Sequence, residues 1–201
     1  MKLVDISHHN GAINWASATA SGDVDAVYMK ATQGASYVDP MFFANRESAK
    51  EIGVPLGCYH YVTPTDQASD QAAHFLNVLG GTVGELAPAL DCESTYSQPG
   101  GAEQWAQIPM EQRIQKILKI GAAVVAGTGV PRLALYCSPS FVDEMLGNDP
   151  RLAVFDLWIA EYGVVAPRIP APFTSYLYWQ NSESGTVPGV GSGDVDTDVS
   201  A

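Results

Sequence analysis

Positive charge is scarce in this chain of 201 residues. It carries ten lysines and arginines against 22 aspartates and glutamates, a formal net charge of −12. Nucleic-acid binding needs a basic surface that neutralises phosphates. The charge balance therefore argues against a nucleic-acid partner and favours a neutral or mixed-charge substrate. An acidic surface that serves only solubility would give the same net charge.

Long hydrophobic runs are missing as well. No stretch approaches the roughly 20 apolar residues of a membrane-spanning helix, so we expect no membrane insertion. The N-terminal LVDIS reaches the polar HHNG too soon for the apolar region of a signal peptide. We therefore expect a chain without a secretory leader, which leaves by another route or is a mature form or excised domain.

Cysteine is rare, and its three copies form no recognisable pattern. Cys58, Cys92 and Cys137 each lie inside or at the end of an apolar run, and none has the spacing of a zinc site. We interpret them as small core residues. The segment DVDTD, residues 194–198, begins like a calcium loop but lacks its glycine and its final glutamate. The sequence thus predicts no metal and no cofactor.

Short apolar runs are what the sequence does contain. The strand candidates are 2–7, 25–31, 53–62, 85–93, 132–138, 154–162, 175–180 and 194–199. Helices are predicted at 40–52 and 139–147, where Asp39 and Ser138 precede prolines as N-caps. Two more are predicted from their apolar faces, over 66–79 and over 110–126. The first connection allows only a short helix.

The pattern of connections changes towards the end of the chain. Segment 163–174 is rich in proline and segment 181–193 in glycine and serine, so neither is expected to be helical. Strand–helix alternation predicts a parallel sheet. We therefore expect one α/β domain over residues 1–201, an irregular barrel of about eight strands in which five have helical connections and the last three are joined by loops. An open doubly wound sheet is the alternative.

Polar and aromatic residues gather at the predicted strand ends. In parallel barrels the active site lies at the carboxyl ends of the strands. The residues at these ends are Asp5, Lys30, Tyr59, His60, Tyr61, Asp91, Glu93, Tyr136, Trp158, Tyr162, Trp179, Gln180 and Asp196. A purely structural barrel has little reason for this pattern. His60 is interpreted as a hydrogen-bonded interior histidine, and the pair His8–His9 as surface or loop.

Asp91 and Glu93 are the most informative of these residues. Residues two apart on a strand point to the same face, so both carboxyls should enter the barrel mouth while Cys92 turns away. Two close carboxyls disfavour double ionisation, which lets a site hold an acid and a base at one pH. Glycoside hydrolysis uses such a pair, and aromatic walls suit sugars. A single D-x-E motif is weak evidence by itself, because two acids at the end of a strand can also be simple exposed surface residues.

Eight segments in order give the chain a resemblance to glycoside hydrolase family 25, the Chalaropsis-type lysozymes, common as phage endolysins and bacterial autolysins. The segments are VDISHHNGAINW (4–15), YMKATQGASYVDPMF (28–42), GVPLGCYHYVTP (53–64), PALDCE (88–93), LYCSPSF (135–141), LWIAEY (157–162), YWQNSESGTVPGV (178–190) and VDTDV (195–199). The resemblance implies a (β/α)5(β)3 barrel and an N-acetylmuramidase, which cleaves the β-1,4 bond between N-acetylmuramic acid and N-acetylglucosamine in peptidoglycan.

The resemblance also implies roles for residues. Glu93 is the general acid, and Asp91 assists by orienting the substrate's 2-acetamido group or by electrostatic stabilisation; Asp5 and Asp196 complete the carboxylate set. The groove residues are Lys30, Gln33, Tyr59, Tyr61, Tyr136, Trp158, Tyr162, Trp179 and Gln180. Gln33 stands where the family usually has glutamate. Asp194 competes with Asp196 for the site, and alignment selects Asp196.

The expected partner is a peptidoglycan glycan strand, bound by a monomer at the bacterial cell wall. The chain is then either made in a host cytoplasm and released as a phage lysin or cut from a secreted protein. Substrate-assisted retention is the favoured course. The alternatives are a chitinase-like N-acetylhexosaminidase and a non-catalytic carbohydrate-binding barrel.

Overall fold

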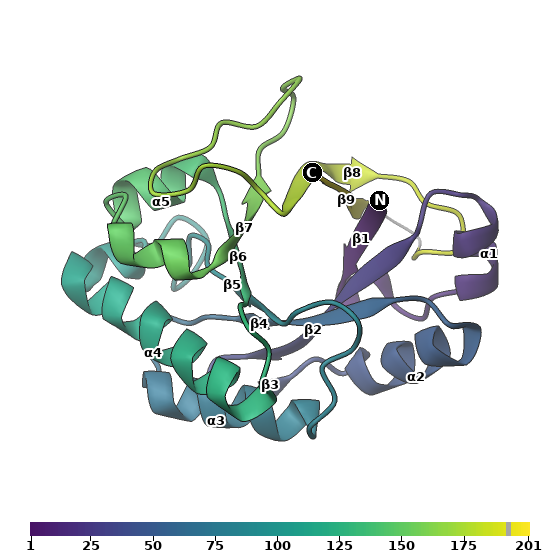
Figure 1. Cartoon of the computed structure of the whole chain (residues 1–201), viewed down its shortest axis with the longest axis horizontal. Coiled ribbons are helices and arrows are strands. Elements are labelled where there is room, and N and C mark those ends of the chain that lie inside the picture. The colour runs from purple at the N-terminus through teal and green to yellow at the C-terminus, as the bar shows by residue number, and fades with distance from the viewer. Residues whose placement is uncertain (192–193) are drawn as a thin grey trace.

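The computed structural model describes residues 1–191 and 194–201, and within them eight strands close into a barrel (Figure 1). These strands are β1 (Lys2–Ile6), β2 (Ala26–Gln33), β4 (Leu56–Tyr61), β5 (Ala89–Asp91), β6 (Ala134–Cys137), β7 (Asp156–Ala160), β8 (Tyr178–Gly185) and β9 (Val195–Ser200). β1 pairs with both β2 and β9, which closes the sheet. The barrel prediction is confirmed, and the open sheet was the wrong alternative.

Helices connect the strands as far as β7. They are α1 (Trp15–Ala20), α2 (Phe42–Ile52), α3 (Ala68–Leu79), α4 (Met110–Thr128) and α5 (Pro139–Met145), with single turns η1 (His8–Asn10), η2 (Trp105–Gln107) and η3 (Pro150–Val154). The side chain of Ser138 caps α5 as predicted, accepting from the backbone N–H of Phe141. The N-cap prediction for Asp39 is wrong, because α2 begins after Met41. Asp39 instead accepts from the backbone N–H groups of Met41 and His8.

The direction of the last strand differs from the predicted parallel sheet. β9 runs antiparallel to both β8 and β1, whereas the other neighbouring barrel strands are parallel. A parallel connection needs a crossover of a dozen or more residues, and only residues 186–194 separate β8 from β9. Segment 163–174 is non-helical as predicted. In segment 181–193, β8 continues to Gly185, and residues 192–193 lie outside the described residues. A further short strand, β3 (Tyr37–Val38), pairs with β2 and was not predicted.

An aromatic layer fills the barrel interior below its mouth. Tyr28 and Trp158 lie in contact there, with ring centroids 4.5 Å apart, and Tyr178 packs against both. Gly57 on β4 makes room for this layer, since a Cβ at that position would stand 2.4 Å from Cε1 of Tyr28. A second, larger core lies between the barrel and the helices and includes the three buried, unpaired cysteines, as predicted. The packed interior forms a floor on which a polar site can be built.

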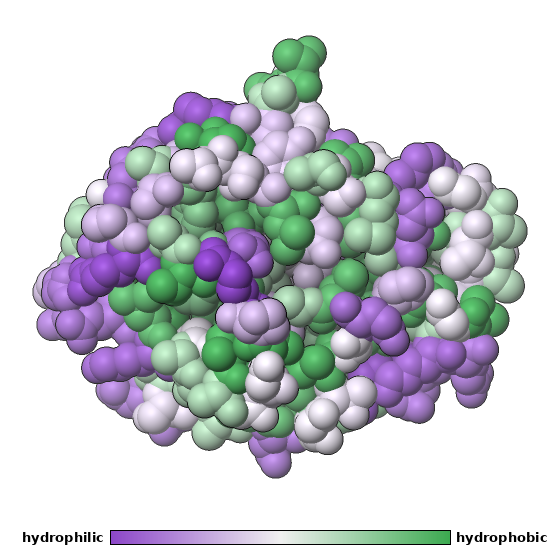
Figure 2. Space-filling model, in the orientation of Figure 1, coloured by the Kyte–Doolittle hydropathy of each residue, from purple (hydrophilic) through white to green (hydrophobic). Residues whose placement is uncertain are grey.

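The chain ends meet beside the barrel (Figure 1), where the backbone N–H of Ser200 donates to the carbonyl of Met1. Polar and apolar atoms are mixed over the face shown in Figure 2, and a hydrophobic knob projects at its top. This knob belongs to the connection between β7 and β8, in which Val165 is fully exposed. Among the described residues, no helix combines the length and the apolar character needed to cross a bilayer.

Candidate active site

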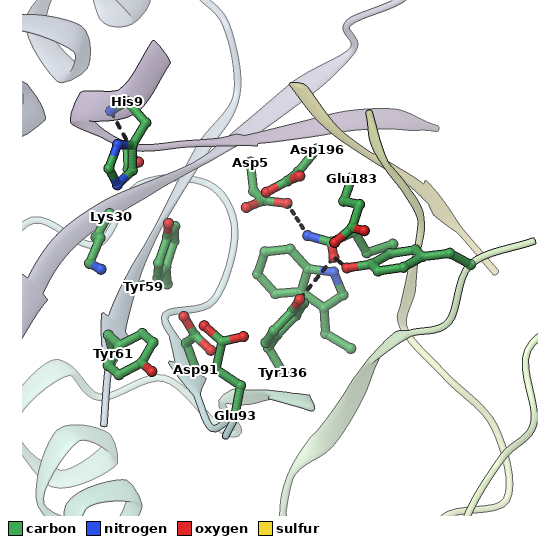
Figure 3. A pocket seen from close by; sticks show the side chains of 14 residues that line it. Asp5, His9, Lys30, Tyr59, Tyr61, Asp91, Glu93, Tyr136, Glu183 and Asp196 are labelled. Carbon is green, nitrogen blue, oxygen red and sulfur yellow. Dashed lines mark hydrogen bonds between the residues drawn. The ribbon is translucent and has the colours of Figure 1, made fainter. Parts of the chain in front are cut away.

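A pocket of about 280 Å³ opens at the mouth of the barrel (Figure 3). Its lining residues are Asp5, Ser7, His9, Lys30, Tyr59, Tyr61, Asp91, Glu93, Tyr136, Trp158, Tyr162, Gln180, Glu183 and Asp196. Every site residue selected from the sequence is among them except Gln33 and Trp179. Residues from strands far apart in the sequence thus meet in one polar cavity above the aromatic floor.

Asp91 and Glu93 lie on one wall of the pocket, as their spacing predicts. β5 ends at Asp91, Cys92 turns into the outer core, and Glu93 returns to the pocket. Asp91 is only 7% exposed, and its buried Oδ1 has no hydrogen-bond partner among the described residues. Glu93 is exposed at the mouth, and its backbone carbonyl accepts from Nε1 of Trp105 at 3.0 Å. One carboxyl is therefore deep and unsatisfied, and the other faces incoming molecules.

Desolvation in the pocket raises the pKa of both carboxyls. Desolvation is the main cause for Asp91, whose pKa lies well above its ordinary value, and the nearby Glu93 raises it further. Desolvation in the pocket also raises the pKa of Glu93; Lys30 lowers it and Asp196 raises it. A protonated Glu93 at the mouth can donate to a substrate oxygen, while the buried Oδ1 of Asp91 beneath it is free, among the described residues, to accept a hydrogen bond.

A second group of carboxyls faces this pair across the pocket. Figure 3 shows Asp5 and Asp196 together on the opposite side from Asp91 and Glu93. They are direct partners in the β1–β9 pairing, and the antiparallel course of β9 brings Asp196 to the mouth from the start of its strand. Burial raises the pKa of Asp196 to about 6, with Glu183 as the next cause. Asp196 lines the pocket, and Asp194 does not.

Gln180 links the second group to two tyrosines. Its Nε2 donates to Oδ2 of Asp5 at 2.7 Å, and its Oε1 accepts from the hydroxyl of Tyr136 at 2.8 Å and from that of Tyr162. Because both ends of the amide are engaged, Asp5 is held in one orientation by groups from β6, from β8 and from the segment that follows β7. The site is thus largely preorganised on rigid strands.

Lys30 lines the pocket, and a β-bulge in β2 determines which residues lie next to it. The pairing of β2 with β4 shifts register between Lys30 and Thr32, so Lys30 pairs with Tyr59 and Gln33 with Tyr61. The bulge brings Gln33 to the same side as Lys30, where its Oε1 accepts from Nζ of Lys30 at 2.8 Å. Gln33 therefore acts on the pocket through Lys30 and does not line it.

Comparison with known proteins identifies the family of the chain. The family model described as Glycosyl hydrolases family 25 matches residues 4–190. The chain belongs to this family. The family 25 chain is 33% identical over 198 residues to Lysozyme M1 of Streptomyces globisporus, covering 96% of this chain and 65% of the relative. It spans about two thirds or less of the length of the first curated relatives that it matches, 65% and 55%.

Solved structures share the fold of the family 25 chain. The crystal structure of the bacterial lysozyme from Streptomyces coelicolor superposes with a TM-score of 0.88 at 30% identity, covering all of this chain and 91% of that one. The CTP1L endolysin superposes with a TM-score of 0.77 at 25% identity, covering all of this chain and 66% of that one.

Sequence reasoning assigned two residues of the family 25 chain to the pocket lining that do not lie there, Gln33 and Trp179, and it missed three residues that do. Trp179 does not line the pocket: it follows Tyr178 and precedes Gln180, which both face inward, so it turns to the outer core and its Nε1 donates to the carbonyl of Glu161. Ser7, His9 and Glu183 line the pocket without having been selected. Ser7 and His9 directly follow β1, a position that could have singled them out. Glu183 lies in the Gly/Ser-rich segment, where β8 was not expected to continue.

Proposed function

We propose that this chain is an N-acetylmuramidase, which hydrolyses the β-1,4 bond between N-acetylmuramic acid and N-acetylglucosamine in peptidoglycan. The observation that carries the proposal is the pair Asp91 and Glu93 on one wall of an aromatic pocket in a family 25 chain. Glu93 is the general acid. Its position at the mouth and its raised pKa suit proton donation to the glycosidic oxygen.

Asp91 supports the reacting sugar. Its buried Oδ1, which has no partner within residues 1–191 and 194–201, is suited to accept the N–H of the substrate's 2-acetamido group. In the first step the acetamido carbonyl oxygen bonds to the anomeric carbon as the leaving oxygen takes the proton of Glu93. In the second step the Glu93 carboxylate removes a proton from water, whose oxygen replaces the acetamido oxygen. The reaction therefore retains the anomeric configuration and restores both carboxyls.

The remaining pocket residues bind the glycan. Tyr59, Tyr61, Tyr136 and Tyr162 offer ring faces to the apolar sides of sugars and hydroxyls to their polar edges. Lys30 lies 4.7 Å from the ring centroid of Tyr61 and can donate to sugar oxygens. The partner is a single glycan strand, bound by a monomer, and no nucleic acid or membrane takes part.

The site of action is the bacterial cell wall. Similarity to an endolysin supports synthesis in a host cytoplasm followed by release, and similarity to Lysozyme M1 is equally compatible with a domain of a secreted protein. The two origins share the same chemistry at the wall.

The roles of the pair are tested with isosteric variants. Glu93→Gln is expected to lower turnover of purified peptidoglycan by about 10²–10⁴-fold, because the amide cannot donate a proton as the bond breaks. Asp91→Asn is expected to lose roughly 10²–10³-fold through lost charge stabilisation. Both variants should still sediment with wall fragments. Asp70→Asn, an exposed change of the same chemistry on α3, is the control and should match the wild type. Near-normal turnover by Glu93→Gln would show that the acid is another residue.

A further inference from the structure

Asp198 is a buried carboxyl that lies outside the pocket. It is on β9, two residues after Asp196, and is 2% exposed. Its Oδ1 accepts from Nε1 of Trp158 at 2.6 Å. Its Oδ2 is also buried and has no hydrogen-bond partner among the described residues. An ionised carboxylate with an unsatisfied buried oxygen is strongly disfavoured, so this oxygen needs a proton or a donor.

Asp5 is the neighbour that can meet this need. Asp5 on β1 lies directly opposite Asp196 on β9, and Asp198 lies opposite Leu3, so Asp198 is the diagonal neighbour of Asp5 on the same face of the sheet. Asp5 already accepts from Gln180 on its Oδ2. A proton between Asp5 and Asp198 would turn a repulsive contact into a hydrogen bond and would satisfy the buried oxygen.

The other groups around Asp198 do not supply a positive charge. The titratable side chains that act on it or feel its charge are Asp5 from β1, Asp196 from its own strand, Tyr28 from β2 and Tyr178 from β8. Trp158 on β7 and Gln180, the cross-strand partner on β8, are neutral donors. Among the described residues, Lys30 acts on Asp91 and Glu93 across the pocket and not on Asp198. With no positive charge among these neighbours, a proton shared with Asp5 is the remaining way to satisfy the buried Oδ2 of Asp198.

We propose that Asp198 is a positioning residue that shares a proton with Asp5 beneath the pocket, and so fixes the orientation and the charge that Asp5 presents to the substrate. The catalytic part of this inference rests on the proposed muramidase function. Burial, with Asp196 as a further cause, raises the pKa of Asp198 to about 7. Burial also raises the pKa of Asp5 well above its ordinary value, with Asp198 as the next cause, so the pair holds the shared proton in acidic solution and releases it as the pH rises through neutrality and above. Two ionised carboxyls then repel each other, and Asp5 loses its fixed place beside Gln180.

Asp198→Asn tests the proposal, because the amide reproduces the protonated state at every pH. Its Oδ1 can accept from Trp158 and its Nδ2 can donate to Asp5. Turnover at about pH 5–6 is expected to stay within about threefold of the wild type, and the alkaline limb of the pH profile to move upward by about one pH unit or more. Asp70→Asn should leave the profile unchanged. An unmoved alkaline limb, or turnover lost at every pH in a folded variant, would overturn the proposal.

A second readout does not depend on activity. The indole N–H of Trp158 donates to Asp198, so its ¹H–¹⁵N resonance in the wild-type chain should titrate near neutral pH, and this titration should vanish in Asp198→Asn. A wild-type resonance that does not move between about pH 5 and 8 would overturn the shared proton even in an active enzyme. If the resonance titrates and the chain cleaves no wall, the proton pair stands and the muramidase proposal falls.

Discussion

The carboxyl cluster of β1 and β9 should make the folded state less stable as the pH rises. The pKa of Asp198 is about 7 in the folded chain, against an ordinary value of 3.8. Between these values the folded chain holds more protons than the unfolded chain, so the free energy of unfolding falls with rising pH. For a single isolated group the difference corresponds to roughly 4 kcal/mol, and because Asp5 and Asp196 share the repulsion we expect about 1–3 kcal/mol from Asp198.

His60 acts in the opposite direction and must be separated from this effect. It is buried between Thr32 and Gln71, as a hydrogen-bonded interior histidine, and burial lowers its pKa to about 4. The unfolded chain therefore binds the extra proton between about pH 4 and 6.5, and this group adds stability as the pH rises through that window. Comparing two variants at each pH cancels the contribution of His60.

The measurement is urea unfolding of the wild type and Asp198→Asn at several pH values. The two chains should agree within about 1 kcal/mol near pH 5, where the carboxyl and the amide make the same hydrogen bonds. The variant should be more stable by about 1–3 kcal/mol near pH 8, with an unchanged dependence on urea. A difference that does not grow between these pH values would refute the reasoning.

Two further variants test the walls and the floor of the pocket. Gln33→Glu places a carboxylate beside Lys30 and offsets the positive charge that lowers the pKa of Glu93. The pH–rate profile should therefore move to higher pH, while turnover at the optimum changes less than about tenfold. An unmoved profile would show that Lys30 does not influence the pKa of Glu93. Gly57→Ala places a Cβ 2.4 Å from Tyr28 and should reduce the free energy of unfolding by about 1–3 kcal/mol, measured in urea. A loss below about 0.5 kcal/mol would mean that the ring and the strand are not in close contact.

Much of the barrel could be predicted from the alternation of strands and helices, and most of the pocket from the polar residues at the carboxyl ends of the predicted strands. The alternation of Asp91, Cys92 and Glu93 is a local property of an extended chain, and the structure shows it as expected. Trp179 was selected together with its neighbour Gln180, although adjacent residues of a strand point to opposite faces. Which of the two faces the pocket depends on register, which the pairing of β7 with β8 decides.

Other features depend on tertiary pairing and leave no local signal. The bulge after Lys30 becomes visible only against β4, and it determines that Gln33 reaches Lys30. The reversed direction of β9 places Asp196 at the mouth and Asp198 beneath it. From the sequence, both residues belong to a short polar segment near the end of the chain, and nothing there distinguishes a buried carboxyl from an exposed one.

The bond that the chain cleaves is the most direct test of the account. Purified peptidoglycan is digested with the wild type and with Glu93→Gln, and the new reducing ends are reduced and identified by mass spectrometry. The account predicts reducing-end N-acetylmuramic acid from the wild type and its loss in the variant. Reducing-end N-acetylglucosamine would contradict it and indicate a glucosaminidase, and wall binding without cleavage by the wild type would indicate a non-catalytic barrel.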